Sequence, residues 1–196
     1  MVTLRNLRLL AVAVLTCGLA GCLDLDERVR LSSDGAAHIT LTALWDRSLY
    51  KTAEQKAQAE RDCDADDPSD NIAVRHAHRW ENRRLACEAR LDTSDWKALN
   101  EMGFGGLKLQ RLEGRRFRLE IDATGASEGT VVGLDAAFRG HNWSITLASG
   151  AITSSNGTIS ADGATVTWRR AFDQLVDPGV AAESKRMWAE GELPTS

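Results

Sequence analysis

The first 22 residues constrain this chain more than any other stretch. Arg5 and Arg8 give it a basic start, an apolar run follows over residues 9–15, and residues 19–22 read Leu-Ala-Gly-Cys. A basic head, a short apolar middle and small residues at a cut are typical of a secretory signal peptide. The apolar run is shorter than the roughly 20 residues that a membrane-spanning helix needs. We therefore expect residues 1–21 to be removed and the remainder to fold outside the cytoplasm.

The same tetrapeptide matches the lipobox of bacterial lipoproteins. Its cysteine, Cys22, would carry a diacylglycerol on its thiol and a further acyl chain on the new amine. Each buried methylene contributes about 0.8 kcal/mol, and two chains suffice for stable anchoring. Leu23 follows where an Asp would favour the inner membrane, so a Gram-negative source would place the protein on the periplasmic face of the outer membrane. The sequence thus predicts a lipid anchor at Cys22 in the cell envelope, the alternative being an ordinary signal peptide with a chance cysteine.

Charge narrows the set of partners. The signal segment contains two of the 24 basic residues and none of the 28 acidic ones, so the mature chain would have a formal charge of −6. Nucleic acid is not expected as a partner because phosphate binding needs a basic surface. A second apolar run of membrane-spanning length is absent from the sequence. The partner that these features predict is the membrane, reached through the lipid.

The remaining cysteines predict a disulfide. Cys17 would leave with the signal and Cys22 would carry lipid, which leaves Cys63 and Cys87. A pair of cysteines in an exported chain is read as a disulfide, since metal and redox sites use closer spacing. In the chain-entropy account, closing this loop contributes about 3.5 kcal/mol. Cys87 falls in a predicted strand and Cys63 just after a predicted helix, so the bond would tie that helix to the sheet.

Alternating patterns predict hairpins. Residues 25–33 place Leu25, Glu27, Val29 and Leu31 on one face, and a strand over 38–45 follows the turn signal Asp34-Gly35. A second hairpin is expected over 74–91 and a third over 107–121, with turns at residues 81–83 and 113–115. Further strands are expected at residues 143–147 and 166–168. We also expect helices over 47–61 with Asp46 as N-cap, over 96–102 with an Asp95 cap and a Gly103 stop, and over 131–138, where Gly133 interrupts the helical pattern.

These elements predict an α+β fold: an antiparallel sheet built of hairpins, with two or three helices packed against it. The expected organisation is a signal peptide at residues 1–21, one domain at 22–176, and a C-terminal tail at 177–196. That tail would contain a short helix over 180–189 with Met187 and Trp188 on it. It is too short to be stable unless it packs.

Two stretches near the ends carry a family resemblance. They are Gly21-Cys22-Leu-Asp followed by a strand that ends in Asp34-Gly35, and the segment 143–168 with its Asn156-Gly157 and Asp162-Gly163 turns. Together they resemble the LppM-type bacterial lipoproteins. The resemblance implies a mixed α and β domain close to the anchor and an association with lipid or glycolipid. Members of that family carry an apolar membrane-spanning tail where this chain has the polar residues 177–196.

Catalytic and metal-binding patterns are scarce. The sequence has no Gly-x-Ser-x-Gly elbow and no Walker loop, so no catalytic residue and no cofactor are predicted. His76 and His78 share a strand face and could reach one metal ion, but an ordinary half-exposed face is the favoured interpretation. The acidic loop with Asp64, Asp66, Asp67 and Asp70 lacks the Gly and Glu of a calcium loop. No metal site is predicted.

The six Trp residues have two interpretations. Trp can stack on lipids or sugars at wet interfaces, but Trp45, Trp80, Trp96 and Trp168 are better explained as core residues. The predicted function is that of a non-enzymatic, membrane-anchored module that binds lipid or glycolipid in the cell envelope. The alternative is a protein-interaction or scaffolding lipoprotein in envelope assembly or maintenance. The residues that would bind the ligand are not predicted.

Overall fold

The computed structural model describes residues 23–64, 74–103, 106–124, 140–177 and 179–195, so Cys22 and the helix expected over 131–138 lie outside the described residues. The predicted α+β class is confirmed. The elements in chain order are β1 (Leu23–Leu31), β2 (Ala37–Asp46), the 3-10 helix η1 (Arg47–Leu49), α2 (Ala53–Cys63), β3 (Val74–Glu81), β4 (Arg84–Thr93), α3 (Trp96–Met102), β5 (Leu107–Arg111), β6 (Arg116–Asp122), β7 (Asn142–Ala148), β8 (Ala151–Ser155), β9 (Thr158–Ile159), β10 (Thr165–Ala171), α5 (Phe172–Val176), the 3-10 helix η4 (Ala182–Lys185) and β11 (Arg186–Glu192).

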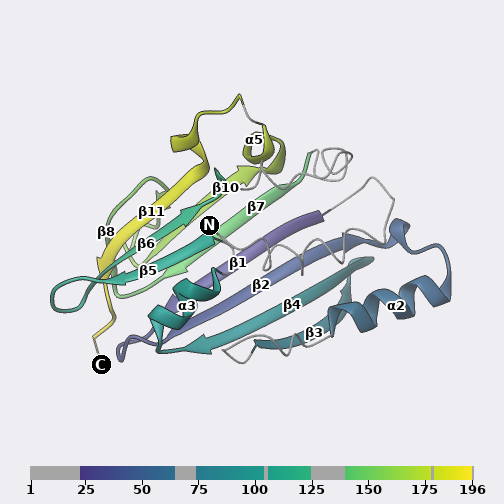
Figure 1. The fold of residues 1–196 in the computed structure, drawn as a ribbon, viewed down its shortest axis with the longest axis horizontal. Helices are drawn as coiled ribbons and strands as arrows, with labels where there is room; N and C mark the ends of the chain where they lie inside the picture. The colour runs from purple at the N-terminus through teal and green to yellow at the C-terminus, as the bar shows by residue number, and fades with distance from the viewer. Residues whose placement is uncertain (1–22, 65–73, 104–105, 125–139, 178, 196) are drawn as a thin grey trace.

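The strands form two sheets rather than the one that the sequence suggested. Seven strands run in the order β3-β4-β2-β1-β7-β10-β9, and four run in the order β5-β6-β11-β8. All described pairs are antiparallel except β1 with β7, which run parallel and join the first and last thirds of the chain. In Figure 1 the smaller sheet lies over the β7 and β10 side of the larger one. The fold therefore has two β layers with helices at their margins.

The three predicted hairpins are confirmed, and each has the turn that its sequence signals. Gly35 takes a φ of 83° between β1 and β2, a left-handed conformation that glycine adopts without steric cost. Asn82 and Arg83 form the β3–β4 turn with φ values of 47° and 64°. β5 and β6 meet around Gly114. Local turn chemistry therefore sets the register of these pairs.

The first helix begins later than the sequence suggested. Asp46 does cap a helical segment, because its side chain accepts the Ser48 N–H at 2.7 Å, but that segment is only the 3-10 helix η1. α2 starts after Thr52, which forms a capping box with Gln55. α3 matches its prediction, since Asp95 accepts from the Ala98 N–H and Gly103 ends the helix in the left-handed region.

The short helix predicted over 180–189 is wrong. Residues 182–185 form a 3-10 turn and residues 186–192 form β11, which lies between β6 and β8 in the smaller sheet. Ala, Glu, Lys and Met favour helix locally, but Met187, Ala189 and Gly191 alternate with charged or amphipathic neighbours and face the core. Tertiary pairing overrides the local preference here.

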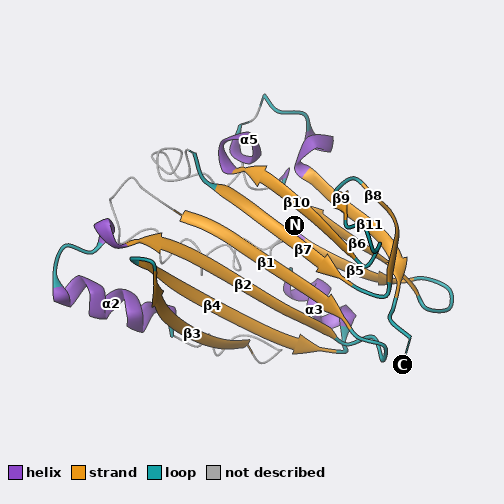
Figure 2. Ribbon diagram, turned by 180° about the vertical axis from the view of Figure 1, so that it is seen from behind, coloured by secondary structure: helices purple, strands orange, loops and turns teal. Residues whose placement is uncertain are grey.

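One apolar core lies between the two sheets. On β1 the odd-numbered residues from Leu25 to Leu31 are buried and the even-numbered ones are exposed or half-buried. We call the face of the larger sheet that carries the odd-numbered β1 residues the inner face, and the opposite one the outer face. Inner residues of β1, β7 and β10 share a core cluster with those of β5, β6 and β11, including the fully buried Trp168 and Phe117. Figure 2 views the larger sheet from its outer side.

We predict that Gly191→Ala destabilises the fold strongly. A Cβ at this position in β11 would lie 2.3 Å from the Ala151 carbonyl oxygen and 2.9 Å from the Phe117 ring, so strands or core must shift. Overpacking of this kind typically costs about 1–3 kcal/mol. Urea unfolding measures the change. Gly114→Ala, where no heavy atom lies within 4 Å of the new Cβ, is the control and should lose only about 1 kcal/mol through its positive φ. Equal losses in the two variants would contradict the tight packing at Gly191.

Candidate functional site

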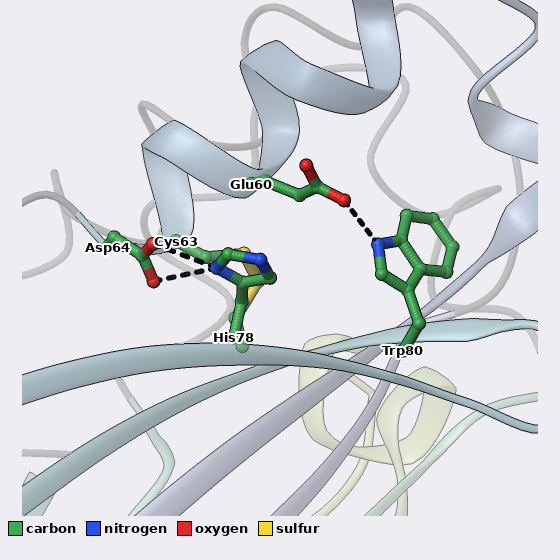
Figure 3. The surroundings of a disulfide bond; sticks show 6 residues. Glu60, Cys63, Asp64, His78 and Trp80 are labelled. Carbon is green, nitrogen blue, oxygen red and sulfur yellow. Dashed lines mark hydrogen bonds and ion pairs between the residues drawn. A yellow bond between two sulfur atoms is a disulfide. The ribbon is translucent and has the colours of Figure 1, made fainter. Parts of the chain in front are cut away.

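α2 covers one margin of the inner face. As predicted, Cys63 at the end of α2 forms a disulfide with Cys87 on β4. Two side chains of β3 rise toward the same helix in Figure 3: the Trp80 indole donates to Glu60 at 2.6 Å, and His78 Nδ1 lies 2.8 Å from Asp64. These contacts bring the helix onto the β3 and β4 side of the sheet, where the disulfide fixes it.

α3 and the smaller sheet cover two other parts of the inner face. The Trp96 indole of α3 donates to the Gly35 carbonyl at 2.9 Å, which places the helix over the end of the sheet where β1 turns into β2. The smaller sheet covers β1, β7 and β10 through the shared core. Within the described residues, inner side chains in the middle of β4 and from the middle to the end of β2 stay only half-buried. These residues, the inner strip, are Leu41, Ala43, Trp45 and Ala89.

The inner strip is an apolar row across β2 and β4, between the central strand β1 and the edge strand β3. Leu41 pairs with Ala89 across β2 and β4, and Ala43 pairs with Cys87. Val74 and His76 lie beside this row on β3 and are half-buried as well. This row is apolar and is bordered by α2, α3 and the smaller sheet, but the described residues do not bury it completely. Sites for apolar ligands have this character.

A buried carboxyl group borders this strip. Glu27 on β1 pairs with Leu41 on one side and with Ile145 of β7 on the other, and its side chain faces inward. Glu27 is fully buried, and neither of its carboxyl oxygens has a hydrogen-bond partner among the described residues. The buried indole N–H of Trp143, on β7, is also without one. Unpaired buried polar groups are rare and costly in folded proteins, so they demand an explanation.

Burial decides the protonation state of this acid. Desolvation raises the pKa of Glu27 to about 8, and the nearby Trp143 indole opposes that shift only partly. The indole N–H does not reach the carboxyl group with the geometry of a hydrogen bond. At neutral pH Glu27 is therefore mostly a neutral acid, with one O–H to donate and a carbonyl oxygen that can accept.

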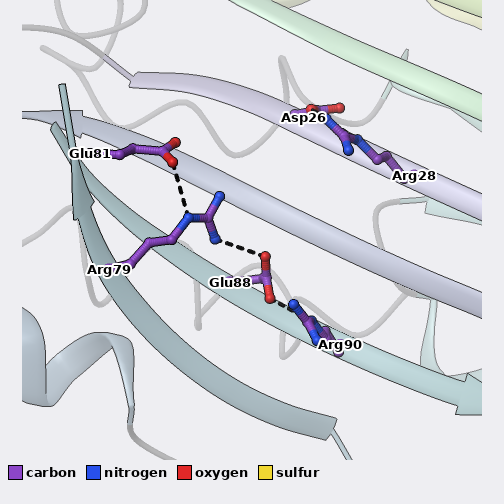
Figure 4. A network of polar contacts seen from close by, with 6 residues as sticks. All are labelled: Asp26, Arg28, Arg79, Glu81, Glu88 and Arg90. Atoms are coloured by element: carbon purple, nitrogen blue, oxygen red, sulfur yellow. Dashed lines mark hydrogen bonds and ion pairs between the residues drawn. The ribbon is translucent and has the colours of Figure 1, made fainter.

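The outer face has the opposite character. Figure 4 shows Arg79 between Glu81 and Glu88, with Arg90 on the far side of Glu88. The two arginines on either side hold the pKa of Glu88 below its usual range, although burial opposes them as the larger single effect. These ion pairs are at least partly exposed, so each contributes little to stability. They keep this face of the sheet hydrated and charged. The inner face, by contrast, is the apolar one.

The residues singled out from the sequence fall in different places. Cys63 and Cys87 meet, whereas the lipidation site Cys22 lies outside the described residues, as do Asp66, Asp67 and Asp70. Among the residues that the structure describes, no three His, Cys, Asp or Glu side chains come together as a metal site. His78 pairs with Asp64 instead, and His76 stays half-buried beside the strip.

Among the tryptophans, Trp96 and Trp168 are core residues as expected, while Trp45 and Trp80 are only half-buried. Sequence reasoning missed Glu27 and Trp143 as a polar pair. The signal was present, because alternation already placed Glu27 on the same face as Leu25 and Val29. An acid on an apolar strand face is a candidate for burial. Trp143 is the first residue of the strand that the sequence predicts over 143–147.

A surface depression elsewhere on the fold is a weaker candidate for a site. It measures about 540 Å³, lies beside α3 and β5, and includes Trp96, Asn100 and Arg111 in its lining. The Arg111 guanidinium stacks over the Trp96 ring at 4.9 Å, and the Asn100 amide is committed to the Leu109 backbone. The Arg111 and Asn100 side chains in this depression are thus already engaged within the protein.

We predict that Glu27 makes stability depend on pH. Its pKa is about 8 when folded, against 4.5 for a free Glu, so the folded protein binds the extra proton between these limits. The contribution of Glu27 to stability is therefore fully present below about pH 4.5 and decreases by on the order of 1.4 kcal/mol per unit as the pH rises toward 8. Urea unfolding at several pH values measures this slope. Glu27→Gln, which never ionises, should flatten it, and parallel wild-type and variant curves would contradict a neutral buried Glu27.

Comparison with known proteins bears on the fold. No protein-family model matches the sequence, and no curated protein matches it. A search of solved structures finds the NMR structure of the Mycobacterium tuberculosis LppM folded domain, with a TM-score of 0.55 and 18% identity over 90% of this chain and 92% of that one. No helix in the described part of the chain is long and apolar enough to cross a membrane. The similarity shows that this chain has an LppM-like fold.

Proposed function

We propose that this protein is a lipid-anchored module of the bacterial cell envelope that binds lipid or glycolipid and catalyses no reaction. The observation that carries the proposal is the inner strip, an apolar row in the middle of a sheet whose margins are covered on three sides. The LppM-like fold and the lipobox at Cys22 support it. In this proposal the acyl part of the ligand lies along Leu41, Ala43 and Ala89.

The polar part of the ligand would meet Glu27 and Trp143. A neutral acid and an indole N–H offer hydrogen bonds to a hydroxyl or an ester carbonyl without placing a fixed charge in the core. Satisfying these two groups would recover part of the free energy that their burial costs in the unliganded protein. This favours a ligand with an uncharged polar group next to its acyl chains.

The scaffolding alternative rests on the acidic surface of the chain and on the C-terminal tail with Met187 and Trp188. Met187 is instead buried in the core, and Trp188 lies within β11 with the Arg118 guanidinium 5.9 Å from its ring. That segment is therefore a structural strand, and the reason to regard it as a docking element is gone.

We predict that blocking the inner strip abolishes lipid binding. Leu41→Glu places a charge in the middle of the apolar row, while Thr42→Glu places the same side chain one residue along on the outer face. Native mass spectrometry of the purified mature chain, before and after exposure to envelope lipids, measures bound lipid. The wild-type protein and Thr42→Glu should carry lipid and Leu41→Glu should carry none.

Circular dichroism shows whether Leu41→Glu is folded. If it is not, Ala43→Phe, which fills the strip without adding charge, replaces it. Absence of lipid from the wild-type protein, or equal binding by both strip variants and the control, would overturn the proposal.

We predict that Cys22→Ser releases the protein from the membrane. The serine hydroxyl cannot form the thioether that holds the diacylglycerol, and the acyl chains on residue 22 are the lipid anchor in this proposal. Growth with labelled fatty acid, followed by cell fractionation with a membrane wash at about 0.5 M salt that screens contacts between charges, measures the effect. The wild-type protein should take up label and sediment with membranes, whereas the variant should do neither. Membrane retention of an unlabelled variant would contradict lipid anchoring.

A further inference from the structure

The end of the larger sheet where β1 begins forms a distinct surface. Leu23 pairs with Trp45 at the end of β2, and Trp45 pairs with Leu85 near the start of β4. Register therefore brings two connections to this end, the segment 46–52 that leads from β2 into α2 and the β3–β4 turn at residues 82–83. In Figure 1 both lie on the right. Cys22 is one residue before this end, so any lipid on it leaves the fold here.

Three cations occupy these connections. Arg47 and Lys51 lie in the first and Arg83 at the tip of the second, and all three are exposed. None of them makes an ion pair within the described part of the chain. The Arg47 N–H donates to the Arg83 carbonyl at 3.0 Å, so the two connections are held together as one surface. We call these three residues the basic end.

The acids nearby are mostly engaged elsewhere. Asp24 pairs with Arg84 at 2.7 Å, and Glu81 pairs with Arg79. Asp46 is held by the Ser48 N–H. Glu54, in the first turn of α2, is the exposed acid that has no ion pair within the described residues. Asp24 and Glu81 are thus neutralised by arginines, whereas Asp46, which accepts an N–H, keeps its charge. Within the described residues, the three cations of this end therefore outnumber the two acids without an ion pair, Asp46 and Glu54.

Aromatic side chains lie beside the basic end. Trp45, Tyr50 and Trp80 are half-buried, and the Tyr50 and Trp80 rings meet edge to face with centroids 5.9 Å apart. Arg83 holds a φ of 64°, a conformation in which a non-glycine residue is uncommon and mildly strained. Lys and Arg together with Trp and Tyr are the residue types enriched where membrane proteins meet lipid head groups.

We propose that the basic end is a membrane-docking surface that binds the anionic phospholipid head groups of the membrane in which the Cys22 lipid is inserted. This inference rests on the proposed lipid anchor. The anchor alone sets only how far the domain can drift from the bilayer. Contacts from Arg47, Lys51 and Arg83 to head-group phosphates fix its orientation, with β1 rising from the membrane and the inner strip open to the side.

Vesicle binding by the unlipidated protein tests this docking. The chain from residue 22 onward contains every described element, and with Cys22→Ser it has no tether. Its partition onto vesicles of phosphatidylcholine with about one-third phosphatidylglycerol is measured by co-sedimentation, against phosphatidylcholine alone. We expect binding to the anionic vesicles only, and loss of it as ionic strength rises from about 0.05 M to about 0.5 M.

A matched pair of double variants locates the surface. Arg47→Gln with Arg83→Asn removes two charges from the basic end, and Asn tolerates the positive φ. Arg30→Gln with Lys108→Gln removes two exposed cations that make no ion pair within the described residues from other parts of the fold. Each head-group contact contributes about fivefold to binding. The first pair should therefore weaken partition about 25-fold and the second should leave it within about twofold.

The outcomes separate this surface from the lipid-binding site. Equal losses in both double variants, or equal binding to neutral vesicles, would overturn the docking surface, as would unchanged binding in the first variant. Circular dichroism confirms that the variants are folded, and native mass spectrometry of the same samples reports lipid held in the strip. Lipid retained by a variant that no longer docks leaves the proposed function intact, whereas salt-sensitive docking without retained lipid removes that function alone.

Discussion

The alternation of side chains along β1 is the constraint on which the rest of the structure depends. β1 is central in the larger sheet, antiparallel to β2 on one side and parallel to β7 on the other. Because successive residues point to opposite faces, a slip of one residue would put Arg28 and Arg30 in the core and Val29 and Leu31 in water. This single register fixes which face receives the second β layer. It also forces Glu27 inward.

The two faces of the larger sheet therefore differ in polarity. The outer face has charged Arg, Asp and Glu side chains on β1, β3 and β4, and these keep it hydrated. Among the described residues, the smaller sheet and the two helices leave part of the inner face of β2 half-buried. An apolar strip therefore lies next to an acid that has no hydrogen-bond partner within the described residues.

The sequence predicted local features better than long-range ones. Turn residues such as Asp34-Gly35, Asn82-Arg83 and Glu113-Gly114 act over a few residues, and their hairpins were predicted correctly. The same holds for the Asp95 and Gly103 caps of α3. The parallel pairing of β1 with β7 was not accessible, because it depends on contacts between residues more than 100 positions apart. The strand β11 was mistaken for a helix because its composition favours helix while its partners, β6 and β8, favour a strand. For the site, the disulfide followed from counting cysteines, but the inner strip could not be found before the covering layers were known.

The place of β11 has a consequence for folding. This strand is the last described element, yet it lies in the interior of the smaller sheet, with β6 and β8 on its two sides. Until residues 186–192 are available, β6 and β8 have no strand between them and the second layer cannot close over Trp168 and Phe117. A chain that emerges from its N-terminus therefore cannot complete its core before this strand is free. In the export that we propose, the same delay would leave the chain unfolded while it crosses the membrane.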